Sequence, residues 1–445
     1  MMFRPQMSSA GPSQKGVRIS VMSPQGKGLL RWQNKIKPIL PIVIILFSIL
    51  LGPAVIVRWG DKTPRVLWVD VVLSVVIGIW ILKGKFFRFR LAGIEQWLIL
   101  YIGIAAIGLP MTVDFLRSLA ILQLRILPLF VFIIVFNSLK TQQDIRVTLK
   151  ALLVFIVLLA VQLLIYGWLN RSEMTSPLPG QVTKSIAQTT WGRSNYLASL
   201  FIILILPLIS MILMKPYRRL LFKFAAAGIV IIALIFTQSR GAFLSLLLGV
   251  VLWILLGAFS GRFRKTGRVI GYISFAVILC IAAWHILPEE VTGAMTSSSR
   301  RLVDQFFWER NSISRLNLLI EAWAGFIKSP IIGIGIGNQY TVLTVAESVH
   351  NLYLETALES GLIGLAALAA YLIAVARVFF HIWKKAPKTQ SQLIAESLMI
   401  SFLISLINAA QEPSFWGPEY AYVLVILIAL ACAMSKIGIP DFAKR

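Results

Sequence analysis

The chain has 445 residues, of which 58% are hydrophobic and only 14% are charged, and its mean hydropathy is +0.82. Soluble chains contain about 25% charged residues, so this composition excludes a soluble globular domain. The formal net charge of +25 would suit a nucleic-acid-binding protein, but the positions of the charges explain it differently, as shown below. Cys280 and Cys432 both lie within apolar runs, so we interpret them as packing residues of separate helices.

Apolar runs long enough to cross a bilayer recur along the chain, since about 20 apolar residues in a helix span the hydrocarbon core. We predict twelve such helices, at about 38–57, 66–82, 94–110, 118–136, 150–169, 194–214, 223–238, 241–259, 269–287, 350–376, 393–410 and 419–435. The expected fold class is therefore an all-α polytopic membrane protein with a single transmembrane domain over residues 38–435. A disordered basic tail over residues 1–37 and a short tail over residues 436–445 are expected to flank it.

Basic residues concentrate at every second junction between the predicted helices. About two thirds of the 43 Lys and Arg residues fall in the segments 1–37, 83–93, 137–150, 215–223, 260–268, 377–392 and 436–445. Because loops rich in Lys and Arg stay on the cytoplasmic side, both termini are predicted to be cytoplasmic. The net charge then reflects topology and attraction to anionic membrane lipids, and no nucleic-acid partner is needed to explain it.

Two long segments are predicted to lie on the outer side, residues 170–193 and the main outer loop 288–349. Within the main loop, residues 312–328 predict an amphipathic helix that Ser312 or Ser314 caps and that ends before Pro330. The apolar face of this helix is expected to hold Leu316, Leu319, Ile320, Trp323 and Ile327.

His350 stands where the main outer loop ends and an apolar run begins, in the sequence HNLYLETALESGLIG. An imidazole there can meet both a lipid-borne substrate and water. Eleven residues make about three helical turns, so Gly361 is expected on the same helix face as His350, with Gly364 one turn further on. Small residues on one face let a neighbouring helix approach closely. The alternative is an interfacial His above a helix-packing face.

Arg240 lies in the sequence TQSRGAF, between two apolar runs, with Gln238 and Ser239 among its few polar neighbours. A charge at bilayer depth costs a few kcal/mol unless it is paired or hydrated, so it marks a candidate functional residue. Arg240 either binds a substrate anion or reaches the phosphates of the membrane lipids.

Other cationic side chains are candidates as well. Arg315, near the start of the amphipathic helix, either adds a bidentate phosphate donor to a helix N-terminus or is a solvated surface residue. Arg193 and Asn195 stand at the outer end of the sixth predicted helix. Arg125 is an intramembrane charge, either functional or paired with Asp70 or a backbone carbonyl of a neighbouring helix.

Motifs for metal or nucleotide binding are absent from the sequence. It contains no D-x-D, no H-E-x-x-H and no Cys/His cluster with metal-ligand spacing, which favours chemistry without a metal or other cofactor. The GIGIG at 333–337 does not belong to a βαβ unit, so we interpret it as a tight turn and not as a dinucleotide-binding loop.

One His, several isolated Arg and no metal motif on the outer face suit transfer from a lipid diphosphate carrier. Arginines would hold the diphosphate and stabilise the charge that builds on it as it leaves. His350 would take the proton of an acceptor hydroxyl as general base.

The spacing of His350, Asn351, Gly361 and Gly364 resembles the H-[NSQ]-x9-G-x-x-G pattern of bacterial O-antigen ligases. TQSRGAF is similar to the S-R-G segment of the wider O-antigen ligase/polymerase superfamily, and P-x-x-G-x-G at 330–335 fits the loop before the His. This resemblance covers residues 190–365. It implies a GT-C-type glycosyltransferase that moves a glycan from undecaprenyl diphosphate on the periplasmic side of the bacterial inner membrane, with inversion and without a metal. It assigns the base to His350 and diphosphate contacts to Arg240 and Arg315.

The acceptor stays open at this point. A ligase would use lipid A core, and a polymerase of the same superfamily would use the growing glycan. The alternative from another class is a transporter for the lipid-linked sugar. Only Arg125 and Asp70 favour it, as ionisable residues within the membrane. The sequence shows no matching halves with broken helices, which a transporter should have.

Overall fold

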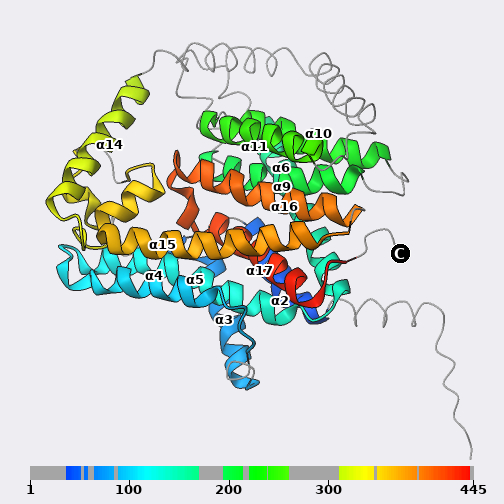
Figure 1. Cartoon of the computed structure of the whole chain (residues 1–445), viewed down its shortest axis with the longest axis horizontal. Coiled ribbons are helices and arrows are strands. Elements are labelled where there is room, and N and C mark those ends of the chain that lie inside the picture. Colours follow the sequence, from blue (N-terminus) through cyan, green and yellow to red (C-terminus); the bar gives the residue numbers. More distant parts are fainter. Residues whose placement is uncertain are drawn as a thin grey trace, which may run out of the picture.

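The computed structural model describes residues 37–51, 55–58, 65–84, 89–169, 194–213, 220–237, 239–259, 310–344, 348–387 and 390–440. Twelve α-helices lie in this described part (Figure 1). They are α2 (Leu40–Leu50), α3 (Trp68–Leu82), α4 (Glu95–Ile107), α5 (Phe115–Ser138), α6 (Gln142–Leu169), α9 (Ser194–Leu213), α10 (Leu220–Phe236), α11 (Arg240–Phe259), α14 (Arg310–Lys328), α15 (Leu352–Lys385), α16 (Gln390–Ala409) and α17 (Pro418–Ile437).

The helical membrane architecture is confirmed. Seven of these helices are long and apolar enough to cross a membrane: α5, α6, α9, α11, α15, α16 and α17. The apolar helices α2, α3, α4 and α10 are shorter. Together these eleven match eleven of the predicted runs, and α14 matches the predicted amphipathic helix. The run 269–287 and residues 1–36, which make up nearly all of the predicted tail, lie outside the described residues.

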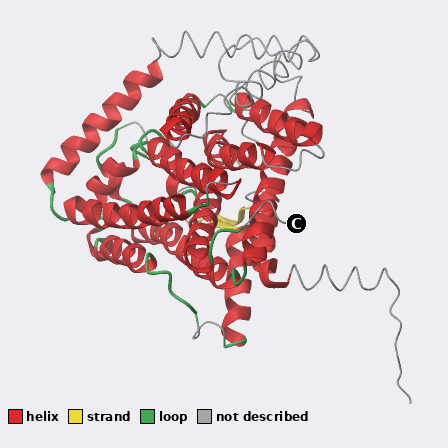
Figure 2. Ribbon diagram, turned by 45° about the vertical axis from the view of Figure 1, so that its right-hand side comes forward, coloured by secondary structure: helices red, strands yellow, loops and turns green. Residues whose placement is uncertain are grey.

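A small element departs from the all-helical prediction. Residues Val55–Arg58 (β1) and Arg65–Leu67 (β2) pair antiparallel, with Val57 opposite Val66 (Figure 2). Branched apolar side chains dominate these short segments, and such side chains favour extended backbone over helix. The predicted helix at 66–82 accordingly begins only at Trp68.

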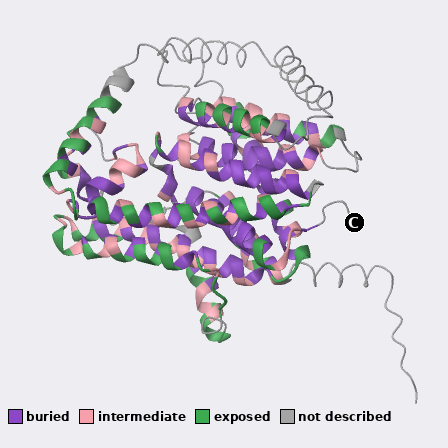
Figure 3. Cartoon of the chain, viewed as in Figure 1, coloured by how far each residue is buried: buried purple, intermediate pink, exposed green. Residues whose placement is uncertain are grey.

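The centre of the bundle is formed by α9, α16 and α17. Their membrane windows are 78%, 78% and 83% buried inside the protein, whereas the window of α11 is only 22% buried (Figure 3). Helix α17 packs on α5, α15 and α6, and α16 packs on α9 and α11. A helix that is apolar all round and buried lies in a core, and one that is apolar and exposed faces lipid. The bundle therefore presents α11 to the bilayer and shields α17 from it.

Helix α14 lies at one end of the bundle, against the first half of α15 (Figures 1 and 2). It begins at Arg310, so Ser312 and Ser314 lie inside the helix, and neither can be the predicted N-cap. Its buried face is also not the predicted one, because the side chains packed inward are Leu318, Ala322 and Phe326. Of the predicted apolar face, Leu316, Ile320, Trp323 and Ile327 are exposed and Leu319 is half-buried.

Helix α15 is broken at Gly361. This residue has φ 64° and ψ −164°, which no residue inside a helix adopts. The segment that follows α14 fills the break: Ile334 and Gly335 donate their N–H groups to the carbonyls of Leu358 and Glu359, at 2.9 and 3.0 Å. On the other side of the break, Leu362 N–H donates to Pro330 O at 2.8 Å. Backbone groups freed inside a membrane must find partners, and these bonds supply them.

Candidate functional site

The side chain of Glu412 is the point on which the candidate site converges. It follows α16 and is only 3% exposed. Asn195 Nδ2 and Arg315 Nη2 both donate to its Oε1, at 2.8 and 2.9 Å. On its other oxygen, Oε2 lies 3.8 Å from His350 Nδ1. The first turn of α9, the first half of α14, the entry to α15 and the end of α16 thus meet at one carboxylate.

His350 has an unusual backbone. Its φ is 55°, and it is the one non-glycine residue with a positive φ in the described part of the chain. Such a conformation costs on the order of 1–3 kcal/mol and persists only where the surroundings impose it. Its N–H donates to Ser348 Oγ at 3.3 Å, and its side chain is 31% exposed. The imidazole is thus held at the edge of the protein, partly open to a ligand.

Asn351 explains how the backbone of His350 is held. As N-cap of α15, it accepts the N–H groups of Tyr353 and Leu354 on Oδ1, both at 3.0 Å, as Asn does at helix starts. Its Nδ2 donates to Ala410 O at 3.1 Å, next to the segment that carries Glu412. One side chain therefore starts the helix and ties His350 to the end of α16.

The predicted alignment of His350 with Gly361 on one helix face is wrong. His350 precedes the helix, and the backbone at Gly361 is not helical. Gly361 has a different use: a Cβ there would collide with the backbone of Ile331. The segment 333–337 is also more than the predicted tight turn, because Gly333 has φ 73° and lies against the backbone of Glu359 and Ser360. Gly364 is buried and lies against Ser360, at the start of the second half of α15.

The partner of Arg125 is Glu359, in place of the predicted Asp70 or a carbonyl. The Arg125 Nη2 group pairs with Glu359 Oε2, and both side chains are sealed from solvent at 1% and 0% exposure. The other oxygen of Glu359 accepts Gly337 N–H at 2.8 Å. Asp70 instead accepts the hydroxyl of Tyr422 at 2.8 Å. The Arg125–Glu359 pair thus joins α5, α15 and the loop before η5 (Asn338–Thr341), in the protein interior.

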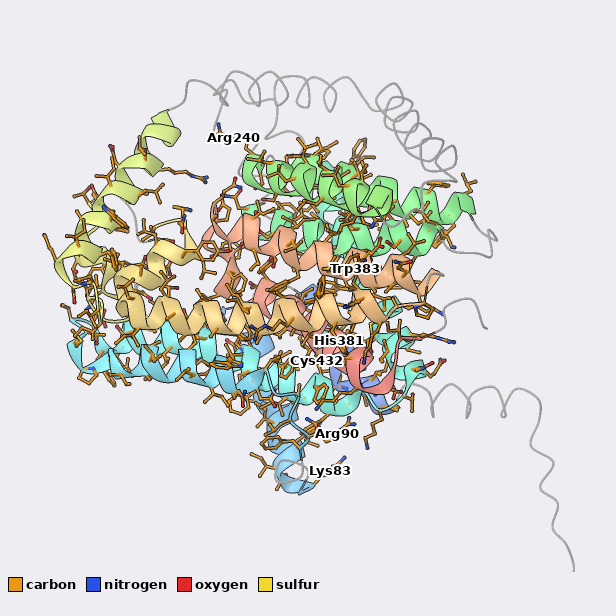
Figure 4. All side chains as sticks on the ribbon, viewed as in Figure 1. Lys83, Arg90, Arg240, His381, Trp383 and Cys432 are labelled. Atoms are coloured by element: carbon orange, nitrogen blue, oxygen red, sulfur yellow. The ribbon has the colours of Figure 1, made fainter. Side chains whose placement is uncertain are left out.

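Arg240 is the first residue of α11, and Figure 4 shows it at the end of that helix which faces α14. The neighbouring Gly241 approaches the Glu412 segment closely, since a Cβ built there would lie 3.0 Å from Gln411 Oε1. Ser239, just before the helix, is buried, and its Oγ has no hydrogen-bond partner in the described part of the chain. Arg193 and Gln238 lie outside the described residues.

The charges around Glu412 keep it ionised. Burial alone raises the pKa of this carboxyl, but His350 and Arg315 beside it outweigh burial and hold its pKa below the ordinary value. Glu412 in turn places one negative charge between a cation and an imidazole. In the described segments no group of three His, Cys, Asp or Glu side chains could hold a metal ion.

Part of this site lies in a segment that is similar to a known family. Residues 225–369 match the family described as O-Antigen ligase. The matched segment contains Arg240, Arg315 and His350, whereas Asn195 and Glu412 lie outside it.

A second similarity is to the teichuronic acid biosynthesis protein TuaE of Bacillus subtilis (strain 168). The two chains are 26% identical over 224 residues, which cover 46% of this chain and 43% of TuaE. The match therefore spans less than half the length of that relative.

The sequence prediction missed Glu412. The sequence feature that could have indicated Glu412 is its position, in the short QEPSFW segment at the expected outer junction between two apolar runs. Charged residues at such junctions are common, and nothing local indicated that side chains from residues 195, 315 and 350 meet there.

Proposed function

We propose that the protein is a membrane glycosyltransferase that moves a glycan from undecaprenyl diphosphate to an acceptor hydroxyl on the periplasmic side of the bacterial inner membrane. The observation that carries this proposal is the convergence of Arg315, His350 and Asn195 on Glu412, within and beside the segment that matches the O-antigen ligase family. A cation for a leaving diphosphate and an imidazole for an acceptor proton then stand on either side of one carboxylate.

In this mechanism the anomeric carbon of the glycan forms a bond to the acceptor oxygen while its bond to the diphosphate oxygen breaks. Arg315 and Arg240, with Arg193 as a further candidate, bind the diphosphate and stabilise its growing negative charge. His350 takes the hydroxyl proton as general base. Because Nδ1 is the ring nitrogen nearest Glu412, Nε2 is the atom we assign to proton transfer. Glu412 then stabilises the imidazolium that forms. The inverting outcome follows from a single displacement.

Two acceptors remain in view. The match to the O-antigen ligase family supports a ligase that uses lipid A core. The likeness to a protein named for teichuronic acid biosynthesis, a product other than O-antigen, supports a polymerase that uses a growing glycan. Surface glycan from a deletion strain separates them: unattached long chains indicate a lost ligase, and single capped units indicate a lost polymerase.

The central test uses purified full-length protein, labelled undecaprenyl-diphosphate glycan and each acceptor, with no energy source. Product formation supports the transferase, and uptake without product supports a transporter. We expect His350→Ala to lower the rate by about 10²–10⁴-fold, the usual contribution of a general base. The amount of folded protein should stay near wild type, because His350 Nδ1 lies 3.8 Å from Glu412 Oε2 and has no hydrogen-bond partner in the described structure. Near-normal turnover in this variant would remove His350 from the mechanism.

A further inference from the structure

A cavity of about 430 Å³ lies at the opposite end of α15 from His350. It is formed by the last turns of α15 and α17 together with the residues that follow them, and the two helices pack on each other. Its volume falls in the range of about 300–1,000 Å³ that is usual for small-ligand sites. None of the groups assigned to glycan transfer lies in it.

The lining of this cavity is basic and carries no carboxylate. His381, Lys385 and Lys436 are among its walls, and Ser435 adds a hydroxyl. All three basic side chains are exposed, and none forms an ion pair in the described part of the chain. On helices that pack against α15, Glu396 of α16 accepts the indole N–H of Trp383 at 3.1 Å, and Glu95 of α4 accepts Gly93 N–H at 2.8 Å. Figure 4 shows His381 and Trp383 along this half of α15.

Lys436 is held in place without losing its capacity to bind an anion. Its Nζ donates to Leu91 O at 2.6 Å and lies 5.3 Å from the ring centroid of Phe136. An ammonium has three donors, so two remain. Basic residues near helix C-termini ordinarily offset the helix dipole. Lys436 lies in the last turn of α17 and also bonds the carbonyl of another segment, so the dipole alone does not fix its position.

The depth of the cavity identifies the class of ligand. The membrane spans of α15 and α17 end at Lys385 and Ile437, so the cavity opens where lipid headgroups lie. Basic pockets between transmembrane helices on the cytoplasmic side bind anionic headgroups. We propose that this cavity is a binding site for the phosphate-bearing headgroup of an anionic membrane lipid. The site is independent of the proposed transfer reaction.

The experiment uses purified full-length protein and phosphatidylglycerol as the probe, with adducts counted by native mass spectrometry. Each Lys that contacts an anionic headgroup contributes about fivefold to the affinity for that lipid. The double variant Lys385→Gln/Lys436→Gln should therefore weaken phosphatidylglycerol binding by about thirtyfold. The matched control Lys83→Gln/Lys140→Gln removes two exposed lysines outside the cavity, and it should bind within twofold of wild type. Figure 4 places Lys83 at the far end of α3.

Three results would overturn the proposal. These are equal binding by wild type and the cavity variant, equal loss in the control variant, or displacement of phosphatidylglycerol from wild type by millimolar inorganic phosphate. The last would assign the cavity to free phosphate. If the double variant does not fold, Lys385→Gln alone keeps the test open, because Lys385 makes no side-chain hydrogen bond in the described structure. It should weaken binding by about fivefold.

Discussion

Two Arg–Glu pairs occur in the described part of the chain, and their burial separates their roles. In the pair Arg315–Glu412 the arginine is 43% exposed, and the carboxylate has a His and an Asn as further neighbours. In the pair Arg125–Glu359 both side chains are sealed inside the bundle. The exposed Arg315 guanidinium can turn to a ligand phosphate at a lower cost than the sealed Arg125, because His350 and Asn195 still face Glu412 when it does. The same two residue types thus suit binding at one place and scaffolding at the other.

The largest expected effect is on the sealed pair. Glu359→Leu leaves the Arg125 guanidinium without its partner and should cost about 3–5 kcal/mol of stability, measured by thermal or denaturant unfolding in detergent. The double variant Arg125→Met/Glu359→Leu removes both charges and should recover most of that loss. A double variant as unstable as the single one would mean that the loss comes from another contact of Glu359, such as that with Gly337 N–H, and not from the unpaired guanidinium.

The Arg315–Glu412 pair, whose arginine is exposed, should respond in the opposite way. Glu412→Gln keeps the shape of the side chain and removes its charge, so we expect transfer to fall by about 10–100-fold, with a much smaller change in stability than for Glu359→Leu. Glu412→Asp, which keeps the charge but shortens the side chain, is the matched control and should retain more activity. Equal activity of the wild type and Glu412→Gln would exclude an electrostatic role for this carboxylate.

A substitution at Arg240 tests whether the site around Glu412 extends to α11. Arg240→Lys keeps the charge but loses the planar pair of donors, and we expect it to lose most activity, by roughly tenfold or more. Lys328→Arg, at the far end of α14, is a control for conservative exchange on the same side of the bundle. Full activity of Arg240→Lys would indicate simple anchoring to lipid phosphates.

The smallest expected effect is on the pH dependence of stability, through Glu412. The pKa of Glu412 in the folded protein lies below its ordinary value of 4.5. A carboxyl with a depressed folded pKa contributes stability that is present above the unfolded pKa and is lost as pH falls through the folded pKa. Stability should therefore decline below about pH 4.5, and Glu412→Gln should flatten that decline. An unchanged profile in the variant would assign the decline to other groups.

The helices could be predicted from sequence because each depends on a local run of apolar residues. His350 and Arg315 could be placed at one end of the bundle for the same reason, since topology alternates along the chain. The partners of the polar groups could not be predicted: Arg125 and Glu359 are 234 positions apart, and Asn195 and Glu412 are 217 apart. The break at Gly361 was also invisible, because a Gly within an apolar run is equally compatible with helix packing. Only the insertion of residues 330–335 distinguishes a broken helix from a continuous one that packs through Gly361.

That insertion has a consequence for how the protein is made. The segment 330–335 leaves the ribosome before Gly361 does, so the backbone that completes the interrupted helix is synthesised before the helix itself. The half of α15 that precedes Gly361 can therefore form against a segment that already exists, and the bonds from Ile334 and Gly335 set its register.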